Sequence, residues 1–125
     1  MALFPCLIGG GSGIEFNPKC IDTSFHSSSA TANTLTYTAT ANGKKHFMFE
    51  NYAYNLTGSL SESITLNGVD IKASCPTAGV QTVAGSFKVI TYEIEVDLNV
   101  GDVLTCVGNY GTGGELVLAS LFMLD

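Results

Sequence analysis

The sequence predicts an all-β protein, a single antiparallel β-sandwich of about eight or nine short strands with little or no helix. The first observation is alternation: in the segment 90–98, ITYEIEVDL, every second side chain is apolar, which is the period of a strand with one buried face. The second is the recurrence of turn signals, among them Asn42-Gly43 and Asn67-Gly68, at intervals of about ten residues. The third is length, since 125 residues provide for one domain only.

The first thirteen residues, MALFPCLIGGGSG, differ from the rest in composition. An apolar octapeptide precedes the glycine-rich stretch Gly9–Gly13, which is typical of a flexible hinge. An exposed apolar tip promotes aggregation, so we expect it to be buried in its own domain or in a partner. The sequence therefore predicts an N-terminal anchor and hinge over 1–13 and a single β-sandwich domain over 14–125. The expected particle-docking residues are Leu3, Phe4, Leu7 and Ile8.

Three strands are expected between residues 14 and 58. The first, IEFNPKCIDTSF, is interrupted by Pro18 and suits a sheet edge, and the small polar stretch 23–32 follows as a loop. The second, NTLTYTATA, ends at Asn42-Gly43, a strong signal for a hairpin turn. The third, KKHFMFENYAYNLT, is rich in aromatic residues. We favour a strand there because its apolar side chains do not align on one helical stripe.

The clearest hairpin signal is Asn67-Gly68, which joins LSESITL to a second strand that we expect to continue to Ala73. Glu62 is the exception in the first of these strands, because it falls on the apolar parity. CPTAG is typical of a turn, and VQTVAGSFKVI of one strand with a bulge at Ala84-Gly85. That strand continues into ITYEIEVDL, where three carboxylates form the solvent-facing row: Glu93, Glu95 and Asp97.

The last strand, ELVLASLFMLD, is apolar on both parities. It follows the turn NVGD, the alternating strand VLTCVGNY and a glycine-rich loop. A strand of this kind must be covered on both faces, inside a sandwich or against another subunit. We therefore expect a symmetric homotrimer whose subunit interface includes Val117, Ala119, Leu121 and Met123.

The composition argues against nucleic acid and membrane partners. The chain has 5 Lys+Arg residues, none of them arginine, against 11 carboxylates, and proteins that bind nucleic acid normally cluster Lys and Arg. No apolar run approaches the roughly 18 residues of a membrane span. The N-terminus lacks the basic region and cleavage site of a signal peptide, so we expect the chain to be made in a cytoplasm and used without processing.

Four cysteines are present: Cys6, Cys20, Cys75 and Cys106. They form no C-x-x-C pair and have no histidine nearby, so neither zinc nor any other cofactor is expected. Two disulfides are one alternative. Because nothing marks a secreted chain, we favour four free thiols.

No motif indicates catalysis, and we expect the protein not to be an enzyme. The nearest candidates, His46 with Glu50 and Ser28 with His26, lack any nucleophile context. A row of carboxylates can bind calcium or act on glycosides, but on an alternating strand it is typical of the solvated face.

Tyrosines near Asn/Gly-containing loops suit contacts with saccharides or proteins, because a flat amphipathic ring binds at little entropic cost. The candidate ligand-contact residues are Tyr52, Tyr54 and Tyr110. The alternative is that these rings line the core and the subunit interface.

Two stretches carry a resemblance to known families. The closing pattern LNVGDVLTCVG, then a glycine-rich loop and a final apolar strand, resembles the trimeric jelly rolls of the complement-globular-head and tumour-necrosis-factor class. In that class a Leu-x-x-Gly-Asp turn, here Leu98, Gly101 and Asp102, precedes the penultimate strand. The opening MALFPCLIGGGSG resembles the openings of small proteins in tailed-bacteriophage structural gene clusters.

The resemblance implies a structural component of a phage virion, made in the host cytoplasm and associated with the tail, baseplate or fibre. Its expected partners are two further copies of itself, other virion proteins, and a glycan or protein on the host surface. A capsid decoration protein is the first alternative. A stand-alone carbohydrate-binding sandwich is the second.

Overall fold

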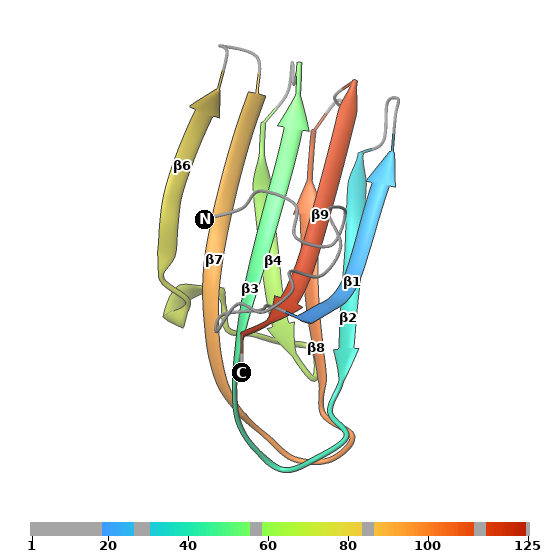
Figure 1. Cartoon of the computed structure of the whole chain (residues 1–125), viewed down its shortest axis with the longest axis vertical. Helices are drawn as coiled ribbons and strands as arrows, with labels where there is room; N and C mark the ends of the chain where they lie inside the picture. The colour runs from blue at the N-terminus through green and yellow to red at the C-terminus, as the bar shows by residue number, and fades with distance from the viewer. Residues whose placement is uncertain (1–18, 27–30, 56–58, 84–86, 112–114, 125) are drawn as a thin grey trace, which may run out of the picture.

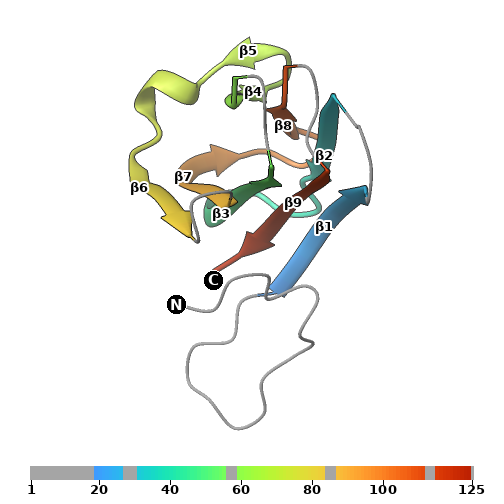
Figure 2. The same ribbon diagram turned by 90° about the horizontal axis from the view of Figure 1, so that it is seen from above.

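The computed structural model of the chain is a β-sandwich of two antiparallel sheets (Figures 1 and 2). It describes residues 19–26, 31–55, 59–83, 87–111 and 115–124. The all-β prediction is confirmed, since within these residues the only helix is the 3₁₀ turn η1 (Lys72–Ser74). The strands are β1 (Lys19–His26), β2 (Ala32–Thr38), β3 (Gly43–Tyr54), β4 (Ser61–Leu66), β5 (Val69–Asp70), β6 (Thr77–Val83), β7 (Phe87–Leu98), β8 (Val103–Asn109) and β9 (Leu116–Met123).

The order of the strands is jelly-roll-like. One sheet has five strands in the order β1-β9-β3-β7-β6, and the other has four in the order β2-β8-β4-β5. The chain crosses between the sheets after β1, β2, β3, β5, β7 and β8, and every pairing of the described strands is antiparallel. The last strand, β9, lies between the first strand and β3, as Figure 1 shows. A chain that passes repeatedly between two antiparallel sheets in this way is typical of Greek-key sandwiches.

The core lies between the two sheets. Phe47 and Phe49 of β3 and Leu121 of β9 face Ile64 and Leu104 of the four-stranded sheet, and all five are fully buried. Each such side chain contributes roughly 1.5–3 kcal/mol to folding through its removal from water. The side chains of β3 and β9 that point toward the second sheet therefore form a large part of the core.

The turn at Asn67-Gly68 is a hairpin turn, as predicted. Asn67 and Gly68 have positive φ values of 51° and 81°, the conformation that a two-residue type I′ turn requires. The following strand is shorter than predicted, however, because β5 has only 2 residues. The predicted continuation to Ala73 is instead η1, where the Cys75 N–H donates to the Lys72 carbonyl at 3.0 Å.

Three other local predictions differ from the structure in which residues form strands or in how the strands pair. Asn42-Gly43 is not a hairpin turn, because it joins strands of different sheets: β2 pairs with β8, whereas β3, which begins at Gly43, pairs with β7 and β9. Residues 23–26, expected in a loop, extend β1 because they pair with β9. The expected single strand around Ala84-Gly85 is the antiparallel pair β6 and β7, with Val83 opposite Phe87, and the predicted bulge lies outside the described residues.

The turn between β7 and β8 is present as predicted. Gly101 has a φ of 93°, and Asp102 Oδ2 accepts a hydrogen bond from the Asn99 N–H at 2.8 Å. The Asn67 amide donates to Asp102 Oδ1 at 3.0 Å. These bonds lower the pKa of Asp102, with the Asn99 bond as the larger cause. The carboxylate therefore ties two turns at the same end of the sandwich.

Candidate functional site

An aromatic cluster lies on the outer side of the five-stranded sheet, the side that faces away from the second sheet. The Tyr54 and Phe87 rings are 4.6 Å apart between centroids, and those of Tyr52 and Phe87 are 5.5 Å apart. Tyr54 stands directly opposite Phe87 in the β3–β7 register, so cross-strand pairing brings the rings together. Phe25 of β1, opposite Leu118 of β9, is 51% exposed. We call Phe25, Tyr52, Tyr54 and Phe87 the aromatic surface.

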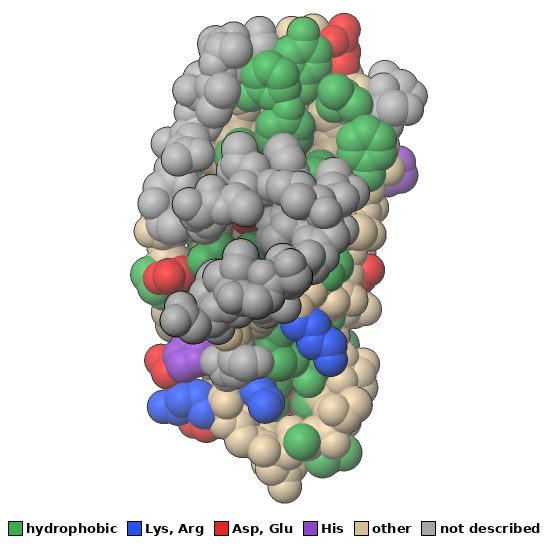
Figure 3. All heavy atoms as spheres, in the orientation of Figure 1, with side chains coloured by type: hydrophobic (Ala, Val, Ile, Leu, Met, Phe, Trp, Pro, Cys, Tyr) green, Lys and Arg blue, Asp and Glu red, His purple; other side chains and the backbone are tan. Residues whose placement is uncertain are grey.

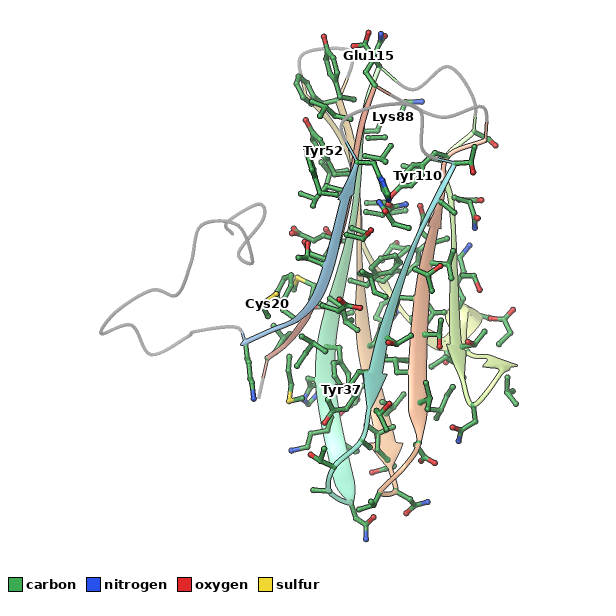
Figure 4. The ribbon with its side chains drawn as sticks, turned by 90° about the vertical axis from the view of Figure 1, so that its right-hand side faces the viewer. Cys20, Tyr37, Tyr52, Lys88, Tyr110 and Glu115 are labelled. Carbon is green, nitrogen blue, oxygen red and sulfur yellow. The ribbon has the colours of Figure 1, made fainter. Side chains whose placement is uncertain are left out.

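Figures 3 and 4 place this surface at one end of the sheet. In Figure 3, hydrophobic side chains gather over the upper ends of the strands of the front sheet. In Figure 4, Tyr52 points to the outer side of the sandwich, whereas Tyr110 lies between the two sheets. Two of the three predicted ligand-contact tyrosines are therefore together at the surface.

The prediction that Tyr110 contacts a ligand from a loop is wrong. Its side chain is fully buried, and its backbone N–H donates to the Thr31 carbonyl at 2.9 Å. A ring with no exposed area cannot meet a ligand at the surface. Burial raises the pKa of Tyr110 to about 12.

The middle of the outer side of this sheet is buried, between the aromatic surface and the exposed carboxylates of β7. Seven residues of β3, β7 and β9 are at most 8% exposed there, although no described strand or helix lies over them (Figures 1 and 2). We call them the covered face: Met48, Glu50, Val89, Thr91, Leu118, Ser120 and Phe122.

The predicted subunit-interface residues lie on the opposite side of β9. Val117, Ala119 and Leu121 are fully buried and Met123 is 9% exposed, and all four pack in the core of their own sandwich. The expectation that these four contact another subunit is therefore wrong. The cause is that both parities of β9 are apolar, and these four form the parity that faces the second sheet.

A chain of buried polar side chains crosses the core. Ser24 Oγ donates to Asn33 Oδ1 at 2.6 Å, and Asn33 Nδ2 donates to Tyr110 Oη at 3.0 Å. The Tyr110 hydroxyl donates to Asn51 Oδ1, and Asn51 Nδ2 donates to Glu62 Oε2 at 3.0 Å. Its members come from β1, β2, β3, β4 and the residue after β8, so the chain links the two sheets.

The donors of this chain are all oriented toward Glu62. A second donor reaches the same carboxylate from β7, where the Tyr92 hydroxyl lies 2.9 Å from Glu62 Oε1. Burial, then the bond to Glu62, raise the pKa of Tyr92. Buried polar groups must be hydrogen-bonded to be tolerated, and this network meets that need for Glu62, which is only 7% exposed. The position of Glu62 on the apolar parity of β4 was the one feature of the sequence that indicated this network.

Gly108 is the position on β8 that makes room for Asn51. A Cβ at residue 108 would lie 2.7 Å from Asn51 Cγ and 2.8 Å from Asn51 Nδ2, closer than real contacts allow. We expect Gly108→Ala to cost about 2 kcal/mol of unfolding free energy, the usual cost of overpacking a core. In an Asn51→Ala background the same change is expected to cost under about 0.5 kcal/mol. Urea unfolding of the four proteins measures both, and equal costs in the two backgrounds would contradict this interpretation.

A shallow groove of about 400 Å³ lies beside the β3–β7 pair. It is lined by residues that include His46, Glu93, Glu95 and Ser74, and His46 Nε2 lies 2.9 Å from Glu95 Oε2. Glu93, Glu95 and Asp97 are exposed, as expected for the solvated row. Within the described residues there is no group of three or more His, Cys, Asp or Glu side chains placed to bind a metal ion. Ser28, the proposed partner of His26, lies outside those residues.

The cysteines differ from the prediction of four free thiols. Cys75 and Cys106 are free and buried, and burial raises the pKa of the Cys106 thiol to about 12. Cys20, however, is disulfide-bonded, so the prediction is wrong there. Since the other two described cysteines are free, its partner lies outside the described residues. The docking residues predicted at Leu3, Phe4, Leu7 and Ile8 also lie outside them.

No protein-family model matches the chain, and a search of curated proteins finds no match. Within the described residues, no helix has the length and hydrophobicity that a membrane span requires. The class that the structure defines is therefore an antiparallel β-sandwich with an aromatic surface on one sheet.

Proposed function

We propose that the chain is a non-enzymatic structural subunit of a bacteriophage virion, associated with the tail, baseplate or fibre, that assembles as a homotrimer through its sandwich and docks by its N-terminal segment. The observation that carries the proposal is the aromatic surface, in which Phe25 is more than half exposed. Exposed apolar patches of this kind mark contacts with other proteins. The occupants that we propose are further copies of this chain.

Two other observations support the proposal. The jelly-roll-like strand order agrees with the resemblance of residues 98–108 to trimeric jelly rolls, in which sandwiches pack around a three-fold axis. The disulfide at Cys20 belongs to a type of bond that persists in oxidising settings, virion surfaces among them. Capsid decoration remains the alternative location, because either site needs the same contacts.

Phe25→Glu tests the subunit contact. We expect light scattering to give a trimeric mass for the natural chain and a monomeric one for the variant, because a charge placed in an apolar contact loses its hydration. The fold should survive, since Phe25 is half exposed on an edge strand.

Val69→Glu and Val100→Glu are the matched controls. Both valines are large exposed hydrophobic residues, at 66% and 63%, and lie away from the aromatic surface. We expect both control variants to remain trimeric. A natural chain that is monomeric at all concentrations, or a Phe25→Glu variant that stays trimeric, contradicts the proposed contact. Electron microscopy of particles containing the protein tests the virion location separately.

A second function is favoured by one observation. The Tyr52, Tyr54 and Phe87 rings form one group at the surface, and aromatic rings bind the faces of sugars. A stand-alone carbohydrate-binding sandwich would bind a glycan as a monomer and lose that binding in Tyr54→Ala. Glycan binding by a monomeric chain would replace the assembly proposal with this one.

A further inference from the structure

We infer that residues 1–8 of this chain occupy the covered face of their own five-stranded sheet and are held there by a disulfide between Cys6 and Cys20. The inference concerns the isolated chain and does not rest on the proposed function. It makes the apolar N-terminal segment a cover that the subunit carries on its own sheet. Docking through this segment would then require it to leave the face first.

The first support is a contrast between the outer sides of the two sheets. On the four-stranded sheet, the outward residues of β2, β4 and β8 are exposed or half-buried, among them Thr34, Thr105 and Val107. On the five-stranded sheet, Leu118 is 3% exposed, Ser120 1% and Phe122 2%. Neighbouring strands alone do not bury a side chain this far, as the four-stranded sheet shows. Something must therefore lie over the covered face, and no described strand or helix does.

The second support is the position and bonding of Cys20. In the β1–β9 register Cys20 is opposite Phe122, at one end of the covered face. Cys20 is disulfide-bonded, while Cys75 and Cys106 are free thiols. The sequence has 4 cysteines, so Cys6 is the partner that remains within the chain. A bond to Cys20 brings Cys6 and its apolar neighbours to the edge of the face.

The third support is a match of length. Along β9 the covered face extends from Phe122 to Leu118, which is about 13 Å at roughly 3.3 Å per residue. Residues 3–8 span up to about 20 Å when extended, so this short segment is long enough to cross the face. The glycines between residues 9 and 13 allow the chain to turn back toward Lys19, which is opposite Met123.

The chemistry of the two surfaces also agrees. Four of the seven residues of the covered face are apolar, Met48, Val89, Leu118 and Phe122. The segment offers apolar side chains in return: Leu3, Phe4, Leu7 and Ile8. Burying each of these four side chains contributes roughly 1.5–3 kcal/mol. A second copy of the chain could bury the same face, but it would not account for a disulfide on Cys20 within one chain.

Peptide mapping without reduction tests the disulfide directly. Trypsin cleaves after Lys19 and so separates Cys6 from Cys20, which places them in peptides 1–19 and 20–44. We expect these two peptides to be recovered joined, and Cys75 and Cys106 to be alkylated only after denaturation. Free Cys6 in the folded, unreduced protein would overturn the inference.

Oxidation of methionine by hydrogen peroxide tests the cover. Met48 belongs to the covered face and Met123 to the core, and trypsin places them in different peptides. We expect Leu7→Asp to speed the oxidation of Met48 on the order of tenfold, since losing 1.5–3 kcal/mol of burial shifts the open population by that factor or more. Met123 should stay protected, and Ser12→Asp, a charge in the glycine-rich stretch, should leave both rates unchanged.

Two further outcomes would overturn the inference that residues 1–8 cover the face. Met48 protected in Leu7→Asp, with the fold intact, means that something else covers the face and overturns the inference. Met48 protection in the natural chain that falls on dilution identifies a second copy as the cover, which overturns the inference as well. If Leu7→Asp fails to fold, peptide mapping and the dilution series on the natural chain still give a result for or against it.

Discussion

Replacing Leu121 with aspartate is expected to abolish folding of the isolated chain. Leu121 is fully buried, with Phe49 opposite it in the β3 register and both side chains in the core cluster. A charge at this position has no partner and no water, a situation that costs several kcal/mol and approaches the total stability of a small domain. Circular dichroism of the purified variant should show loss of the β spectrum.

Thr34→Asp is the matched control for this experiment. Thr34 is exposed on the outward side of β2, so the same new charge remains in water there. We expect it to change stability by less than about 0.5 kcal/mol, as surface changes usually do. A Leu121→Asp variant that stays folded and only dissociates would restore the expectation from the sequence that Leu121 lies between subunits, and would contradict the packing described here.

The β9 strand shows how much of its burial can be predicted from the spacing of its apolar residues. The two apolar parities of ELVLASLFMLD correctly indicated that the strand is covered on both sides, and every residue from Val117 to Met123 is buried. Which parity faces the core was not encoded locally, because Leu121 and Phe122 are equally apolar. That choice depends on the register with β3, which joins residues more than 60 positions apart.

The turn dipeptides did not by themselves predict which strands pair. Asn67-Gly68 and Asn42-Gly43 carry the same dipeptide, and only the first joins paired strands. A turn needs only its own residues to adopt positive φ, whereas the partner of each strand is set by contacts with distant segments. The same limit applies to Glu62: its wrong parity was visible, but its donors Asn51 and Tyr92 come from other strands.

This network is the basis of the second large effect that we expect. Asn51→Ala should lower the unfolding free energy by about 4 kcal/mol. The substitution removes the amide that donates to Glu62 and the oxygen that accepts from the Tyr110 hydroxyl, and both groups are buried. A hydrogen bond to a charged group contributes about 1.5–3 kcal/mol, and leaving a buried neutral donor without its partner costs about 1–3 kcal/mol. Urea unfolding measures the loss.

The network also predicts how substitutions combine. Asn51→Ala leaves the Glu62 carboxylate short of a donor, so removing that carboxylate as well should recover part of the loss. We expect the double variant Asn51→Ala/Glu62→Ala to be more stable than the sum of the two single effects by about 1–2 kcal/mol. Asn99→Ala is the control and should change little, because Asn99 is exposed and its hydrogen bonds with Asp102 are made by its backbone N–H and carbonyl. Strict additivity would mean that Asn51 and Glu62 stabilise the sandwich independently, and that the chain of bonds across the core does not act as one unit.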